Sequence, residues 1–106
     1  MITDTAIRRL SRRIVEYFEP ERIILFGSRA YGRARRGSDV DLLVVMPFKG
    51  KSARKAAEIL NQIEPKFPVD LVVRSPRELR RRLAQNDAFL NEIWRRGKVL
   101  YEATHP

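Results

Sequence analysis

Three of the five aspartates in this sequence lie in segments that otherwise look like buried β-strands: Asp39, Asp41 and Asp70. Aspartate is depleted from strands because its short polar side chain packs poorly on a pleated surface. Asp39 and Asp41 are two residues apart, so on a strand both carboxylates lie on one face. Neighbouring carboxylates repel, and each raises the pKa of the other unless a cation lies between them. If the strand of Asp70 neighbours that of Asp41, three carboxylates converge.

A cluster of carboxylates with neither cysteine nor histidine is typical of a site for a hard cation, and Mg²⁺ is the ion we expect. The chain has no cysteine, and its single histidine, His105, is next to the last residue. Two Mg²⁺ ions about 3.5–4 Å apart could bind the attacking and leaving oxygens of a phosphoryl-type displacement. The alternative is that one or more of these aspartates is a helix cap or a turn residue.

A Gly–Ser pair precedes the two neighbouring aspartates. Gly27 and Ser28 come directly after the apolar run 22–26. Glycine lets a phosphate approach the backbone closely, and free N–H groups at the start of a helical turn bind anions. The Ser28 hydroxyl can donate a hydrogen bond to a phosphate oxygen. A Gly–Ser pair alone is usually an ordinary turn, so its meaning here depends on the residues after it: four arginines, at Arg29, Arg33, Arg35 and Arg36, and then the aspartates.

The net charge of +9, from 22 basic and 13 acidic residues, indicates an anionic partner. Residues 8–13 contain four arginines spaced to share one side of a helix, and residues 77–82 contain another four. Each cluster is either a solvated face or a docking surface for an acidic partner. Direct nucleic-acid binding is not expected, because no aromatic residues alternate with the basic ones to stack on bases.

Hydrophobic periodicity predicts alternating helices and strands. We expect strands over 22–26, 39–46 and 69–74, an edge strand over 98–102, and helices that begin near Thr3, Asp4 or Thr5, at Ser52, at the capping box Ser75–Glu78, and at Asn86 or Asp87. The last helix is expected to place Phe89 and Trp94 in the core. This order of elements predicts an α/β domain in which helices pack on a small sheet.

Length and composition favour one globular domain spanning residues 1–106, since this length supports a single core. Hydrophobic residues make up 43% and charged residues 33%, which argues against disorder. There is no apolar run of about 18 residues that could span a membrane, and no secretory signal at the N-terminus. Together with the absence of cysteine, this predicts a cytoplasmic protein.

The stretch from residue 27 to residue 44 resembles the signature of the DNA polymerase β-like nucleotidyltransferase superfamily. It reads Gly27–Ser28, then ten residues, then Asp39–Val40–Asp41. With Ser38 before the first aspartate and Asp70 further on, the chain looks like the minimal nucleotidyltransferases of prokaryotes. The resemblance implies an α+β fold with a mixed β-sheet flanked by helices, and nucleotidyl transfer from a nucleoside triphosphate that depends on Mg²⁺.

The resemblance also implies roles for individual residues. Asp39, Asp41 and Asp70 would be the catalytic carboxylates and the metal ligands, and Asp70 would also help to activate the acceptor hydroxyl. The nucleotide-binding residues would be Gly27, Ser28, Arg29 and Ser38.

Many minimal nucleotidyltransferases are paired with a helical HEPN-domain protein as a toxin–antitoxin system. The resemblance therefore implies an antitoxin that transfers AMP from ATP to a hydroxyl of its HEPN toxin, a tyrosine in such pairs. An alternative is a non-catalytic module that neutralises a helical partner by binding alone. A second alternative is transfer to a small molecule. It is weaker, because 106 residues leave little wall for a closed pocket around such an acceptor.

Overall fold

The computed structural model describes residues 2–34 and 38–104, so the predictions for Arg35, Arg36, Gly37 and His105 concern residues outside it. The elements come in the order α1 (Asp4–Phe18), β1 (Arg22–Phe26), β2 (Val40–Val45), α2 (Ser52–Ile63), β3 (Val69–Arg74), α3 (Pro76–Ala84), α4 (Ala88–Arg96) and β4 (Lys98–Glu102). In the described part of the chain, no helix is both long and apolar enough to cross a membrane.

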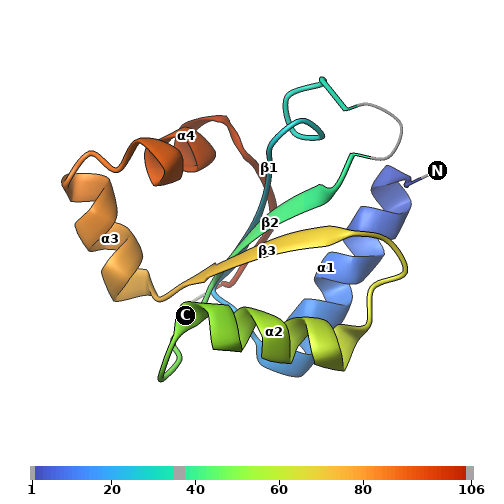
Figure 1. Cartoon of the computed structure of the whole chain (residues 1–106), viewed down its shortest axis with the longest axis horizontal. Coiled ribbons are helices and arrows are strands. Elements are labelled where there is room, and N and C mark those ends of the chain that lie inside the picture. The colour runs from blue at the N-terminus through green and yellow to red at the C-terminus, as the bar shows by residue number, and fades with distance from the viewer. Residues whose placement is uncertain (1, 35–37, 105–106) are drawn as a thin grey trace.

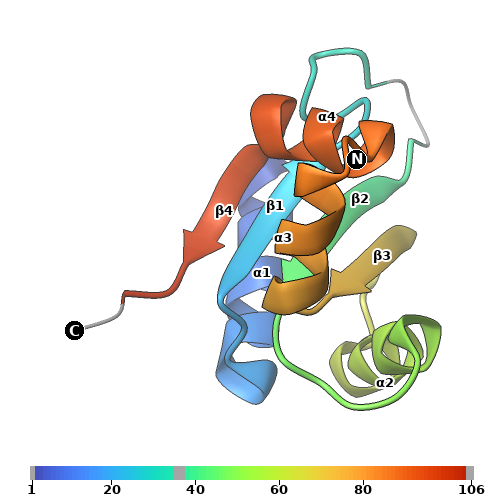
Figure 2. The same cartoon turned by 90° about the vertical axis from the view of Figure 1, so that its left-hand side faces the viewer.

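The four strands form one mixed sheet in the order β3-β2-β1-β4. Strand β1 pairs antiparallel with both β2 and β4, whereas β2 and β3 run parallel and are connected through α2. A parallel pair requires such a crossover, since the chain must return to the same end of the sheet. The predicted mixed sheet with a C-terminal edge strand is therefore confirmed (Figure 2).

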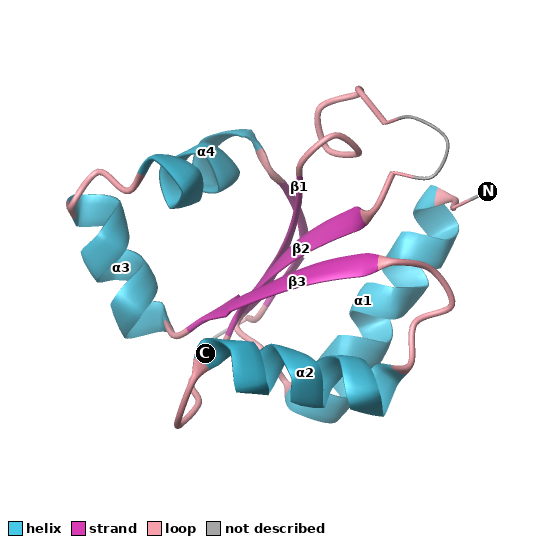
Figure 3. Cartoon of the chain, in the orientation of Figure 1, coloured by secondary structure: helices cyan, strands magenta, loops and turns pink. Residues whose placement is uncertain are grey.

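The helices form two layers, one on each face of the sheet (Figures 1 and 3). Helices α1 and α2 pack on one face around a cluster that includes Ile14, Ile59 and Leu42. Helices α3 and α4 pack on the other face around a smaller cluster that includes Leu43 and Leu90. Because successive strand residues point to opposite faces, Leu42 and Leu43 belong to different clusters.

The starts of three helices agree with the sequence prediction. The Thr3 hydroxyl accepts from the Ala6 N–H at 3.1 Å, Ser75 caps α3 and Asp87 caps α4. The predicted cap at Ser52 is wrong. Lys51 holds the cap position of α2 without a side-chain hydrogen bond, and Ser52 is the first helical residue. Its hydroxyl instead accepts a hydrogen bond from Arg74.

The side chains that helix α4 buries are not the ones that the sequence predicted. Leu90 and Ile93 are each 1% exposed, whereas Phe89 is 49% and Trp94 41% exposed. Residues five positions apart on a helix point about 140° apart around its axis, so Phe89 and Trp94 cannot both face the sheet. The buried stripe of α4 runs between them, and each aromatic ring lies at one edge of it.

Candidate active site

Strand register brings two of the predicted carboxylates together. Asp41 on β2 lies directly opposite Asp70 on β3, and on its other side it lies opposite Phe26 of β1. The residues on either side of Asp41 in β2, Val40 and Leu42, are fully buried in the α1/α2 cluster. Because side chains alternate along a strand, Asp41 and its register partners point to the α3/α4 face.

Asp39 joins this pair from just outside the sheet. The strand begins at Val40, so the prediction that Asp39 lies within it is wrong by one residue. Asp39 is exposed, but its charge still acts on Asp41. Partial burial raises the pKa of Asp41 above its ordinary value, and the charges of Asp70 and then Asp39 raise it further. Asp41 is therefore the centre of a set of three interacting carboxylates.

The donor set fits a divalent cation, although it is not yet arranged around one. Within residues 2–34 and 38–104, no group of three or more carboxylate, thiol or imidazole side chains forms a ready metal site. The mutual repulsion at Asp41 is, however, what a bound cation would relieve. Carboxylate oxygens are also the ligands that Mg²⁺ prefers. We therefore treat Asp39, Asp41 and Asp70 as the residues that could hold it.

Gly27 lies directly against the Asp41 carboxylate. Its φ of +74° is in the left-handed region, and a Cβ at this position would collide with Oδ2 of Asp41. Only glycine satisfies both the backbone conformation and the close approach. The Gly–Ser turn predicted from the sequence to bind phosphate therefore adjoins the carboxylates in space as well as in sequence.

The loop after Gly27 folds into a short turn, as the sequence predicted. The N–H groups of Ala30 and Tyr31 donate to the Gly27 carbonyl at 3.0 and 3.2 Å, and Arg33 N–H donates to the Ser28 carbonyl at 2.8 Å. This turn places Ser28, which is partly buried, directly after Gly27, the residue that lies against the Asp41 carboxylate.

Arg29 ties the start of this loop to its end. Its Nε and Nη2 atoms both donate to the Ser38 carbonyl, at 3.1 and 2.8 Å. Ser38 is next to Asp39, so this bidentate contact fixes the approach of the chain to β2. The structure thus places all four predicted nucleotide-binding residues, Gly27, Ser28, Arg29 and Ser38, around the two ends of one loop. Their contacts with a nucleotide remain a prediction.

Helix α4 borders the site, which the sequence did not predict. The Phe89 ring meets the Phe26 ring edge to face, with centroids 5.6 Å apart and planes at 86°. At the other end of the helix, the Arg96 guanidinium lies 4.3 Å from the centre of the Tyr31 ring, in the loop after Ser28. The exposure of Phe89 could have been anticipated from Leu90 and Ile93, which define a buried stripe that excludes it.

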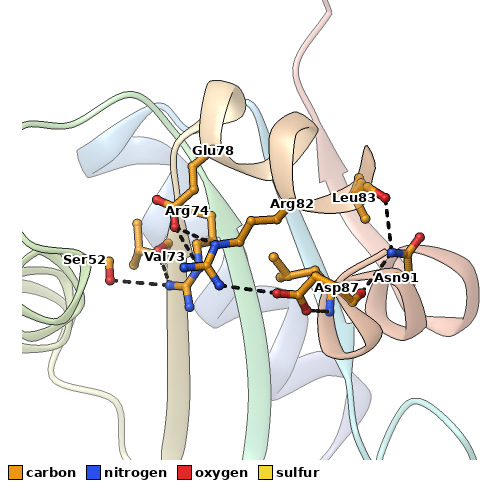
Figure 4. Close-up of polar contacts among 9 residues, drawn as sticks. Ser52, Val73, Arg74, Glu78, Arg82, Leu83, Asp87 and Asn91 are labelled. Carbon is orange, nitrogen blue, oxygen red and sulfur yellow. Dashed lines mark hydrogen bonds and ion pairs between the residues drawn. The ribbon is translucent and has the colours of Figure 1, made fainter. Parts of the chain in front are cut away.

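A chain of ion pairs holds α3 and α4 together (Figure 4). Glu78 accepts from Arg82 at 3.1 Å and lies 3.8 Å from Nε of Arg74, the last residue of β3. Arg82 continues to Asp87 at 3.3 Å. The Leu90 N–H donates a hydrogen bond to the Asp87 carboxylate. This hydrogen bond lowers the pKa of Asp87, and the neighbouring Arg82 lowers it further. The chain thus connects the end of β3 to the first turn of α4.

The sequence matches the family described as the nucleotidyltransferase domain over residues 7–99. Since this match spans most of the chain, the protein belongs to the nucleotidyltransferase domain family. Comparison with curated proteins gives no match.

Solved structures share this fold. A protein from Sulfolobus solfataricus described as a nucleotidyltransferase is 24% identical, with a TM-score of 0.59, over 73% of this chain and 70% of that one. A toxin–antitoxin structure with AMP-PNP is 19% identical, with a TM-score of 0.52, over 92% and 74%. A mutant of the toxin–antitoxin MntA–HpeT is 20% identical, with a TM-score of 0.55, over 92% and 74%.

Proposed function

We propose that this chain is a Mg²⁺-dependent nucleotidyltransferase that moves AMP from ATP to a hydroxyl group of a partner protein. The observation that carries the proposal is the register of the sheet. It sets Asp41 opposite Asp70 on the face that α3 and α4 leave partly open, with the Gly27 backbone against the Asp41 carboxylate. Carboxylates that can hold metal ions, next to a turn that can bind phosphate, suit a phosphoryl-type displacement.

In the proposed reaction, the acceptor hydroxyl oxygen attacks the α-phosphorus of the nucleotide. The bond from that phosphorus to the bridging oxygen of the β-phosphate breaks, and pyrophosphate leaves. Asp70, exposed on the edge strand beside Asp41, takes the hydroxyl proton. Gly27 and Ser28 would bind the β- and γ-phosphates through backbone N–H groups and the Ser28 hydroxyl. Positioning and charge stabilisation then provide most of the rate.

Asp39, Asp41 and Asp70 would hold the metal. When bound, Mg²⁺ supplies positive charge that stabilises the developing charge on the phosphate oxygens and polarises the reacting oxygen. Two features of this chain favour binding of a positive ion at these residues. The carboxylates repel one another without a cation, and Arg29 keeps Asp39 close to β2 through the Ser38 carbonyl.

The proposed partner is a HEPN-domain toxin, with this chain as its antitoxin. Two solved structures with this fold are toxin–antitoxin assemblies, and AMP-PNP, an ATP analogue, is present in one. The half-open site also suits a macromolecular acceptor, which would itself close the side that this chain leaves exposed. The net charge of +9 favours association with an acidic protein surface.

Label transfer tests the proposal. The purified protein is incubated with Mg²⁺ and a lysate of the source organism, with ATP labelled on either the α- or the γ-phosphate. We expect one protein band that carries only the α-label and is absent with the Asp39→Ala/Asp41→Ala double variant. Mass spectrometry of the band then identifies the modified hydroxyl.

Two outcomes contradict the proposal. Transfer of the γ-label would indicate a kinase instead. Neutralisation of a bound toxin partner that survives in the Asp39→Ala/Asp41→Ala variant, with no α-label transferred by the wild type, would indicate the non-catalytic module.

A further inference from the structure

An exposed aromatic ring lies beside the carboxylates, on the same face of the sheet. Phe89 is the second residue of α4, and its ring packs edge to face on Phe26. Phe26 is the register partner of Asp41, so the two side chains leave the sheet in the same direction. Phe89 therefore covers the end of β1 at the level where Asp41 projects from β2.

Phe89, which is 49% exposed as a residue, lies over Phe26 near a boundary on this face. On one side of the boundary, Leu43 and Val45 are buried beneath α3 and α4. On the other side, Asp41 is only partly buried and Asp70 is exposed. A half-exposed phenylalanine offers a flat hydrophobic surface, and here its ring contacts Phe26, the residue directly before the Gly27–Ser28 turn that is proposed to bind the phosphates.

The backbone that carries Phe89 is fixed from several directions. Asp87 caps α4 through the Leu90 N–H at 3.0 Å and pairs with Arg82 (Figure 4). The Asn91 side-chain amide donates to the Asp87 carbonyl at 2.9 Å and to the Leu83 carbonyl at 3.4 Å. A surface that is already ordered loses little conformational freedom when a ligand binds to it.

We propose that Phe89 stacks on the nucleobase of the triphosphate whose phosphates lie at Gly27 and Ser28. This inference rests on the proposed function, since it requires a nucleotide at that turn. A nucleoside triphosphate has one planar apolar part and one anionic part. This side of the sheet offers one planar apolar ring next to one phosphate-binding turn. Because every base has a π-face, Phe89 contributes affinity and not a choice between bases.

The test is a binding titration with three probes, each with Mg²⁺: a non-cleavable ATP analogue with a methylene between the α- and β-phosphorus, the corresponding GTP analogue, and inorganic tripolyphosphate. For Phe89→Ala we expect about ten-fold weaker binding of both nucleotides, the scale of one base–aromatic stack, and unchanged binding of tripolyphosphate. Phe89→Leu keeps an apolar contact with Phe26 but has no flat face, so it should behave in the same way.

Two further variants complete the set. Phe89→Tyr retains the ring and should bind the nucleotides as the wild type does. Trp94→Ala is the matched control, because Trp94 is a half-exposed aromatic residue of the same helix whose ring contacts Arg22, at the opposite end of β1. Its nucleotide affinity should not change.

The outcomes separate this inference from the proposed function. Nucleotide binding by both Phe89→Ala and Phe89→Leu with wild-type affinity would overturn the inference alone. An equal loss for tripolyphosphate in these variants would also overturn it, since the residue would then act on the phosphates or on the fold. A wild-type protein that binds none of the three probes would overturn the inference and the proposed function together.

Discussion

Helices α1 and α2 cover the sheet along the whole of β2, whereas α3 and α4 cover only part of the opposite face. Toward α1 and α2, β2 presents Val40, Leu42 and Val44, all 0% exposed. Toward α3 and α4, it presents the buried Leu43 and Val45, and then the partly exposed Asp41. One face therefore provides stability along its full length, and the other leaves one end free for chemistry.

The comparison shows how a chain of this size can hold both a core and a site. The alternation of side chains along a strand lets adjacent residues serve opposite purposes. Asp41, with a raised pKa, lies between two of the most buried residues of the chain. The fold tolerates this carboxylate because the α3/α4 layer leaves it partly exposed.

Replacement of Asp41 should separate activity from stability most strongly. Asp41→Asn removes the central charge of the site, so we expect nucleotidyl transfer to fall on the order of a thousand-fold. Without metal, the variant should melt at a slightly higher temperature than the wild type, since partial burial and then repulsion by Asp70 and Asp39 disfavour the charged carboxylate. Label transfer and thermal melting measure the two effects. Asp4→Asn, in the first turn of α1, is the control and should leave transfer unchanged.

The adjacent residue should behave in the opposite way. Leu42 is fully buried on the α1/α2 face, so Leu42→Ala should lower the free energy of unfolding by about 2–5 kcal/mol, measured by urea denaturation. Transfer per folded molecule should persist at low temperature. If Leu42→Ala lost activity while remaining folded and stable, the assignment of stability to one face of the sheet and of activity to the other would be wrong.

Gly27 tests the contact between the turn and the carboxylate. Gly27→Ala places a Cβ against Asp41 and requires alanine in a left-handed conformation, which alone costs about 1–2 kcal/mol. Gly32→Ala is a matched control, because Gly32 also has a φ of +74° but faces open space. Both variants should be destabilised, and only Gly27→Ala should also lose nucleotide binding. Equal binding by the two variants would show that the close approach to Asp41 is unimportant.

The smallest expected effect is on pH dependence. The folded protein raises the pKa of Asp41, so protonation of this group favours the folded state. As pH rises through the folded pKa, that contribution is lost. In metal-free buffer, the melting temperature of the wild type should therefore fall relative to Asp41→Asn between acidic and neutral pH. A constant difference between the two proteins across that range would contradict the raised pKa.

Local patterns in the sequence were sufficient for the strands and for the acidic residues. The apolar runs located every strand to within a residue or two, and the i, i+2 spacing singled out Asp39 and Asp41 as candidate site residues, of which Asp41 is the register partner of Asp70. These features depend on properties of short segments, such as alternation of side chains and the rarity of aspartate in strands.

Features that depend on contacts between distant segments were not predicted. The edge-to-face contact of Phe89 with Phe26 depends on how α4 lies across β1, and the ion pair between Arg82 and Asp87 depends on how α4 follows α3. Ser52 was expected to cap a helix but binds Arg74, 22 residues away. Serine at the start of a helix often caps it, so the local pattern favoured a cap here. In the folded protein, a hydrogen bond with a distant residue takes the place of that cap.

Metal-dependent nucleotide binding tests the central claim most directly, because it requires no acceptor. The non-cleavable ATP analogue is titrated by calorimetry into the wild type and into Asp39→Asn/Asp41→Asn, each with Mg²⁺ and with EDTA. We predict binding only by the wild type with Mg²⁺, and melting that confirms a folded double variant. Equal affinity in EDTA, or in the folded double variant, would contradict the assignment of the open sheet face as the nucleotide site.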